Sequence, residues 1–156
     1  AGCVSVVNFI PYTNCLAKLM KLPGGKRVEE ALAEADANLK EIEGPCLQVL
    51  DRLIARIRGL AETPQPTVDD LDEIYARSNE IVGLGGVFGM KDLSAAAYSL
   101  CELVDRTRDR GGPDAKSLAV HVDSLRLLRL GGAIDEAERA KMLDGLANVV
   151  RRVAAG

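Results

Sequence analysis

Apolar residues recur along this chain with the three- and four-residue spacing of one helix face. From residue 26 to 42 they predict a first helix, with apolar positions Val28, Ala31, Leu32, Ala35, Leu39 and Ile42. The pair Gly44-Pro45 predicts a break, with Pro45 in the first turn of a second helix. That helix carries Cys46, Leu50, Leu53, Ile57 and Leu60, a spacing typical of antiparallel bundle packing.

Four more helices are predicted after the connection at residues 63–67. The third runs from Val68 to the glycines that end at Gly89, and Thr67 with Asp70 resembles a capping box at its start. The others cover about residues 90–110, 114–131 and 135–153. We expect these inward positions: Leu71, Ile74, Ser78 and Ile81; Leu93, Ala96, Ala97, Leu100, Cys101 and Val104; Leu118, Val122, Leu125 and Leu128; Ala140, Leu143, Leu146, Val150 and Val153.

The pattern predicts an all-α protein, because no stretch alternates like a β-strand. Short connections favour antiparallel neighbours, so residues 27–131 are expected to form an antiparallel up-down four-helix bundle. Residues 1–26 form a short N-terminal extension in this interpretation. Residues 132–156 form an extra C-terminal amphipathic helix, packed on the bundle or pairing two copies in a homodimer.

Composition excludes several functions. The net charge of −3 and the pI of about 5.3 leave no basic footprint for nucleic acid and no polybasic membrane patch. The four cysteines are widely spaced, so we expect neither a metal site nor a cofactor. No apolar run reaches the roughly 18 residues of a membrane helix, and the expected location is cytoplasmic. The opening "AGC" is compatible with a lipoprotein cleavage site, although nothing else is typical of an exported protein.

Glycines interrupt the third predicted helix in the segment "NEIVGLGGVFG", residues 79–89. Each glycine inside a helix costs about 1 kcal/mol relative to alanine. On a helical wheel Asn79 lies about 100° from the inward direction, and it shares its surface strip with Asp72, Ala76, Gly83 and Gly86. The sequence therefore predicts a surface with little side-chain bulk around one polar group.

This segment resembles the motif of histidine-containing phosphotransfer (HPt) domains, roughly H-x-x-[KR]-G-x-x-G-x-x-G. Gly83, Gly86 and Gly89 match its three glycines, and Ile81, Leu84 and Phe88 match its apolar positions. The resemblance covers about residues 27–131. It implies a four-helix bundle whose partners are a response-regulator receiver domain or a histidine kinase, and whose exposed histidine transfers a phosphoryl group.

Two positions depart from that motif. Asn79 stands where the phosphoacceptor histidine is expected, and Val82 stands at the basic position. An amide nitrogen has no free lone pair to attack phosphorus, so Asn79 cannot replace histidine. We therefore expect a non-transferring adaptor or inhibitor in two-component phosphorelay signalling, rather than an enzyme. Its expected contact residues are Tyr75, Ala76, Asn79, Val82, Gly83, Gly86 and Phe88.

Two alternatives remain open. His121, the only histidine, could be a relocated phosphoacceptor, but it lies in the apolar stripe between Leu118 and Leu125. We expect it to be a core histidine held by a hydrogen bond. The other alternative is a purely structural or oligomerisation bundle.

Overall fold

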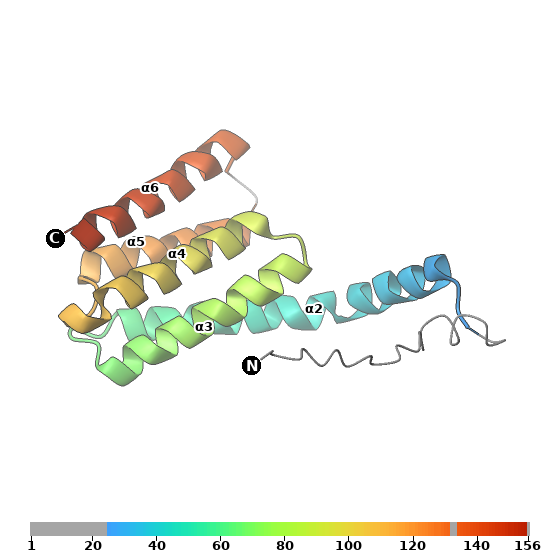
Figure 1. The fold of residues 1–156 in the computed structure, drawn as a ribbon, viewed down its shortest axis with the longest axis horizontal. Helices are drawn as coiled ribbons and strands as arrows, with labels where there is room; N and C mark the ends of the chain where they lie inside the picture. Colours follow the sequence, from blue (N-terminus) through green and yellow to red (C-terminus); the bar gives the residue numbers. More distant parts are fainter. Residues whose placement is uncertain (1–24, 132–133, 156) are drawn as a thin grey trace, which may run out of the picture. The chain divides into compact units, whose positions relative to one another are not determined.

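The computed structural model describes residues 25–131 and 134–155, and these form helices joined by short connections (Figure 1). No strand occurs in this part of the chain, so the predicted all-α class is confirmed. The predicted N-terminal extension lies almost wholly outside the described residues. The elements are α2 (Val28–Ala61), α3 (Val68–Val87), α4 (Lys91–Thr107), the short 3-10 helix η1 (Arg108–Arg110), α5 (Ala115–Leu130) and α6 (Glu136–Ala155).

The predicted break at Gly44-Pro45 is wrong, because α2 continues through Pro45. Proline fixes φ near −65°, which is compatible with a helix, and it removes only one backbone donor. The carbonyl that loses this donor belongs to Glu41, which is exposed, so water can satisfy it. Good helix formers such as Glu43 and Leu47, two residues to either side of Pro45, favour the helical conformation.

The chain separates into two compact units, residues 1–40 and 41–156, and the division falls within α2. The expected bundle began at residue 27, whereas the larger unit begins at Glu41. The apolar stripe of the predicted first helix is not part of the hydrophobic core. On α2 the core residues are Leu50, Leu53, Ile54, Ile57 and Leu60.

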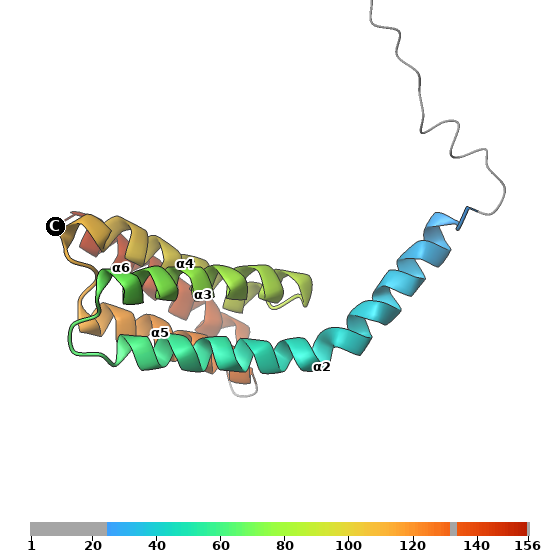
Figure 2. The same ribbon diagram turned by 90° about the horizontal axis from the view of Figure 1, so that it is seen from below.

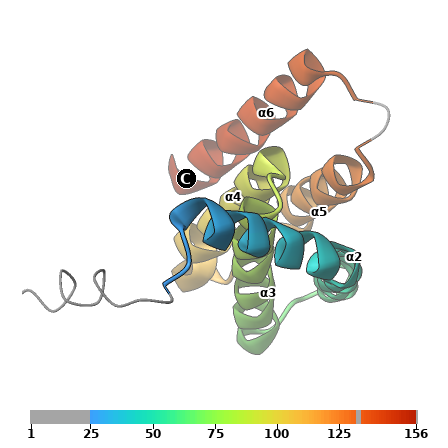
Figure 3. The same ribbon diagram turned by 90° about the vertical axis from the view of Figure 1, so that its right-hand side faces the viewer.

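Helix α4 packs against three other helices of the larger unit: α3, α5 and α6 (Figures 1 and 3). It buries Leu93, Ala96, Ala97, Leu100, Cys101, Leu103, Val104 and Thr107, which include all of its predicted inward positions. Ala96 and Ala97 are fully buried and allow the neighbouring helices to approach α4 closely. This helix therefore supplies the centre of the core.

The start of α3 follows the predicted signal. At the start of α3, Asp70 N–H donates to Thr67 Oγ1 at 3.2 Å, and Thr67 N–H donates to Asp70 Oδ2 at 2.8 Å. This confirms the capping box and lowers the pKa of Asp70, chiefly through the hydroxyl of Thr67. Asp135 and Glu138 exchange the same two kinds of bond before α6.

Helix α6 lies against α4 and α5 and adds Leu146 and Val150 to the core. Its apolar face is thus used within the chain, and the homodimer through this helix stays a prediction. Ala140 was expected to face inward but is exposed. The apolar contact of α6 begins one turn later, at the half-buried Leu143. Over the described ranges, no helix combines the length and apolar character needed to cross a membrane.

We predict that Thr67→Ala lowers the free energy of unfolding by about 1 kcal/mol, the usual value of a helix N-cap. The physical reason is that Asp70 N–H loses its acceptor at the start of α3. Urea titration followed by circular dichroism measures the change. Thr63→Ala, in the same connection but outside the cap, is the control. Equal losses in both variants would contradict the role of the cap.

Candidate docking face around Asn79

The surface of α3 around Asn79 has the predicted orientation. Leu71, Ile74, Ser78 and Ile81 are buried, which confirms the inward face. The strip made by Asp72, Ala76, Asn79, Gly83 and Gly86 is exposed along its whole length. The buried hydroxyl of Ser78 donates to Ile74 O at 2.7 Å, so this polar residue fits the core within its own helix.

The segment at the end of α3 contains four glycines, at positions 83, 85, 86 and 89. The fold itself requires Gly85 and Gly89. A Cβ atom on Gly85 would lie 2.5 Å from Ser94 Oγ and 3.3 Å from Met90 O. Here Ser94 of α4 donates to Val82 O of α3 at 3.1 Å, so the two helices lie close together. Gly89 has a φ of +71°, and Met90 N–H donates to Gly85 O at 2.7 Å. This arrangement is a Schellman motif, which favours glycine at its left-handed position.

The other two glycines have no such role. A Cβ atom on Gly83 or Gly86 would meet nothing within 4 Å. Both lie inside α3 and on the exposed strip. Alanine would therefore fit at either position and would stabilise the helix. What these two glycines provide is a bare backbone surface beside Asn79.

Aromatic and apolar residues border this surface. Tyr75 is exposed, whereas Val82 and Phe88 are half-buried, and Val82 packs against the core. Phe88 is the C-cap of α3. The predicted contact residues Tyr75, Ala76, Asn79, Val82, Gly83 and Gly86 therefore lie on α3 itself, and Phe88 lies at its end.

Tyr98 of α4 joins this surface, although it was not among the contact residues predicted from the sequence. Ser94 contacts Val82, and Cys101 Sγ donates to Tyr75 O at 3.6 Å. Tyr98 is four residues after Ser94 and three before Cys101, so it lies on the same side of α4, at the level of Asn79. It is 62% exposed. Its helical-wheel position opposite the buried Leu100 was the available signal in the sequence.

Several charged residues of α3 and its neighbours are paired. Arg77 bonds to Glu80 on α3, and Asp72 bonds to Arg108 of η1. Glu73 accepts from Arg56 of α2 at 2.7 and 2.9 Å, and this bond lowers the pKa of Glu73. On α4, Arg106 pairs with Glu102. The face centred on Asn79 thus presents small, apolar and amide groups within a rim of neutralised charges. We name it the Asn79 face.

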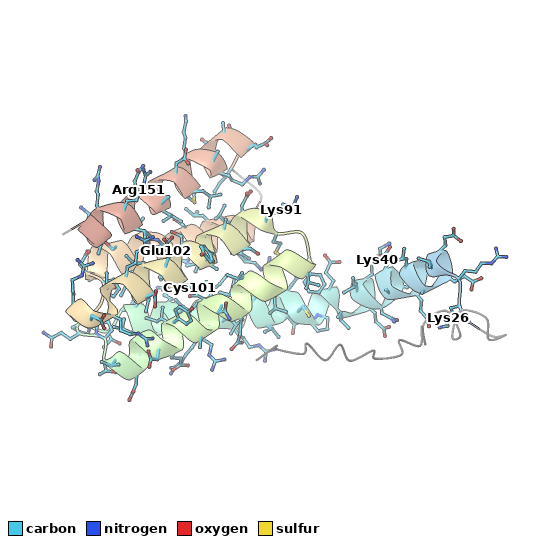
Figure 4. All side chains as sticks on the ribbon, viewed as in Figure 1. Lys26, Lys40, Lys91, Cys101, Glu102 and Arg151 are labelled. Atoms are coloured by element: carbon cyan, nitrogen blue, oxygen red, sulfur yellow. The ribbon has the colours of Figure 1, made fainter. Side chains whose placement is uncertain are left out.

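Cys101 lies on the side of α4 that faces α3, and Lys91 begins this helix (Figure 4). Burial raises the pKa of the Cys101 thiol to about 11. The thiol is therefore protonated at neutral pH and is a poor nucleophile. Across the described ranges, no cluster of three His, Cys, Asp or Glu residues could hold a metal ion.

His121 is buried, with 0% of its surface exposed, and both ring nitrogens have partners. Nδ1 lies 2.8 Å from Ser117 O and Nε2 lies 3.1 Å from Ser99 Oγ. A carbonyl oxygen only accepts, so Nδ1 carries the proton and Nε2 accepts from the Ser99 hydroxyl. Burial lowers the pKa of His121. These contacts confirm the expected core histidine held by a hydrogen bond.

The described residues therefore form an exposed candidate surface around Asn79, and the imidazole of His121 is not part of it. Asn79 is accessible but chemically inert, whereas His121 has the right chemistry and is inaccessible. Comparison with known protein families, curated protein sequences and solved structures gives no match for this chain.

We predict opposite effects on stability from alanine at neighbouring glycines. Gly83→Ala and Gly86→Ala should each raise the free energy of unfolding by about 0.5–1 kcal/mol, because they only remove the helical cost of glycine. Gly85→Ala should lower it by about 1–3 kcal/mol, because its Cβ overlaps Ser94 Oγ. Adding Ser94→Ala should recover part of that loss. Urea unfolding measures all four, and stabilisation by Gly85→Ala would contradict the close approach of α3 and α4.

We also predict a pH dependence from His121. Its folded-state pKa is below the ordinary 6.5, so the unfolded chain binds a proton that the folded chain excludes. The resulting stability is fully present above pH 6.5 and decreases as the pH falls toward the lower folded-state pKa. Unfolding measured at pH 7.5 and 5.5 should show this loss in the wild type and a smaller one in His121→Gln. Equal losses in both proteins would assign the dependence to other groups.

Proposed function

We propose that this protein is an HPt-like adaptor of two-component phosphorelay signalling that binds its partner without transferring a phosphoryl group. In this proposal residues 41–61 of α2, with α3, α4 and α5, form an up-down bundle of HPt type. Helix α6 is an addition to that bundle. The partner is a receiver domain or a histidine kinase. The widely spaced cysteines favour a reduced, cytoplasmic setting.

The observation that carries the proposal is the openness of Gly83 and Gly86. Each costs helix stability, and neither is required by packing or by backbone conformation. Removing side chains from an exposed strip lets a second surface approach the helix backbone. The strip also contains Asn79, and Tyr75 and Tyr98 border it. Exposed aromatic residues beside a small-residue surface are suited to a modest protein interface.

The chemistry of Asn79 supports binding over transfer. Phosphoryl transfer to a side chain requires a nucleophilic lone pair, which an amide nitrogen lacks. It is also assisted by a cation that neutralises the phosphoryl oxygens. At the basic position of the motif, Val82 packs against the core instead. A partner docked here is therefore occupied without being phosphorylated or dephosphorylated, which would inhibit or sequester it.

Transfer through His121 is the weaker alternative. A phosphoacceptor must enter the active site of another protein, and His121 has no exposed surface. Exposing Nε2 would require the loss of its bond to Ser99 and the separation of α4 from α5. The geometry of His121 is instead that of a residue that stabilises the core.

Binding is tested first, with receiver domains and histidine kinases from the same genome assayed one at a time by calorimetry. We predict that Gly83→Gln weakens binding by about tenfold or more, a loss of about 1.4 kcal/mol. The open space around Gly83 lets the variant fold normally. Gly145→Gln is the matched control, because Gly145 is an equally open helical glycine on α6. Equal affinities for both variants would remove the Asn79 face from the interface.

Phosphotransfer is tested with a labelled histidine kinase and its receiver. The wild type should take no label, whereas Asn79→His with Val82→Lys should gain it if the surface retains the HPt shape. Label on the wild type that disappears in His121→Ala would overturn the adaptor proposal in favour of transfer. Binding without label on the wild type supports it.

A further inference from the structure

An apolar stripe of α2 lies outside the core. Val28, Leu32, Leu39 and Ile42 are 74%, 61%, 37% and 48% exposed, and Ala35 falls between them on the same face. Their four-three spacing is that of a helix side that packs against other helices. Between residues 28 and 43 the chain carries six carboxylates (Glu29, Glu30, Glu34, Asp36, Glu41 and Glu43) and one cation, Lys40. We call this the acidic stripe.

A groove of about 450 Å³ lies between α2 and α5, which run side by side in the larger unit (Figure 2). Ile54, Ala55 and Gly59 of α2 contribute small and apolar groups to it, and Leu130 of α5 contributes another. A Cβ atom on Gly59 would meet nothing within 4 Å, so a second helix could approach the backbone there. Leu130 is 76% exposed. We call this the α2–α5 groove.

Three arginines line the groove, and they are unequally engaged. Arg58 Nε lies 2.6 Å from Glu62 Oε1. Arg129 Nη2 donates to Asp51 Oδ2 at 3.1 Å, while its Nε lies 2.9 Å from Oδ1 without the alignment of a hydrogen bond. Arg126 has the longest contact of the three, 3.6 Å from Nη1 to Asp123 Oδ1, and both of these side chains are largely exposed. Donor groups of Arg126 thus remain free for an incoming carboxylate.

We propose that the acidic stripe of one copy docks into the α2–α5 groove of a second copy. The apolar residues of the stripe would lie on Ala55, Gly59 and Leu130. Its carboxylates would meet the arginine rim, with Arg126 as the principal contact. A helix that places its apolar side in a groove is a common mode of recognition. Two such contacts, related by a two-fold axis, close a dimer.

Charge selects this arrangement over the pairing of two stripes. Two acidic stripes placed side by side would bring their carboxylates together, and like charges oppose association. Three arginines outnumber the two carboxylates that also line the groove, Asp51 and Glu62, so the groove instead attracts an acidic stripe. The dimer uses surfaces of α2 and α5, whereas the proposed receiver-binding face lies on α3 and α4, so the two proposals can fail independently.

Sedimentation equilibrium of the full chain tests the proposal. The wild type should be dimeric at micromolar concentration. The stripe variant, Leu32→Glu with Leu39→Glu, and the groove variant, Gly59→Gln with Arg126→Glu, should both be monomeric. Each has a matched control with the same added groups elsewhere: Ala33→Glu with Ala37→Glu on α2, and Gly145→Gln with Arg151→Glu on α6. Both controls should remain dimeric.

Mixing the two broken variants identifies the occupant of the groove. The stripe variant keeps an intact groove and the groove variant keeps an intact stripe, so a 1:1 mixture should recover heterodimers through one of the two contacts. A groove variant that stays dimeric, or a mixture that stays monomeric, would overturn the stripe-in-groove arrangement. A monomeric wild type would overturn self-association altogether. Unchanged circular dichroism of the monomeric variants excludes unfolding as the cause.

Discussion

The packing of α4 against α3, α5 and α6 is the constraint on which the larger unit depends. Almost half of α4 is buried, and its small residues Ala96 and Ala97 have no exposed surface. For another helix to approach α4 closely, the facing helix must also carry small residues at the contact. Gly85 meets that requirement on α3, where Ser94 of α4 reaches the carbonyl of Val82. The rotation of α3 about its own axis follows from this contact.

That rotation decides which residues of α3 meet solvent. With Gly85 against Ser94 and Tyr75 O against Cys101, the strip containing Asn79 faces outward. Ion pairs from Glu73 to Arg56 and from Asp72 to Arg108 join the two sides of α3 to neighbouring elements. Exposed ion pairs of this kind add little stability, but they neutralise the charges nearest the strip. The same packing that builds the core thus produces an uncharged surface at its edge.

Much of this architecture could be predicted from the sequence, because helical periodicity and caps are local signals. The buried faces of α3 and α4 and the capping box at Thr67 were predicted correctly. The continuation of α2 through Pro45 could not be, since proline is well placed in the first turn of a new helix and costs about 3 kcal/mol inside a continuous one. The place of Tyr98 beside Asn79 was equally hidden, because it depends on which face of α4 meets α3. The different roles of Gly83, Gly85, Gly86 and Gly89 also required coordinates.

An open glycine is not by itself a sign of a binding surface, since Gly59 and Gly145 are also helical glycines without neighbours. Gly83 and Gly86 differ from Gly145 in their surroundings. They are one turn apart on one face, with Asn79 a turn before them and exposed aromatic residues on two helices beside them. Gly59 has an analogous setting in a groove with an exposed leucine and arginines. The two places where missing side chains coincide with exposed apolar groups are therefore the two surfaces from which contact with other proteins is expected, and they lie on different pairs of helices.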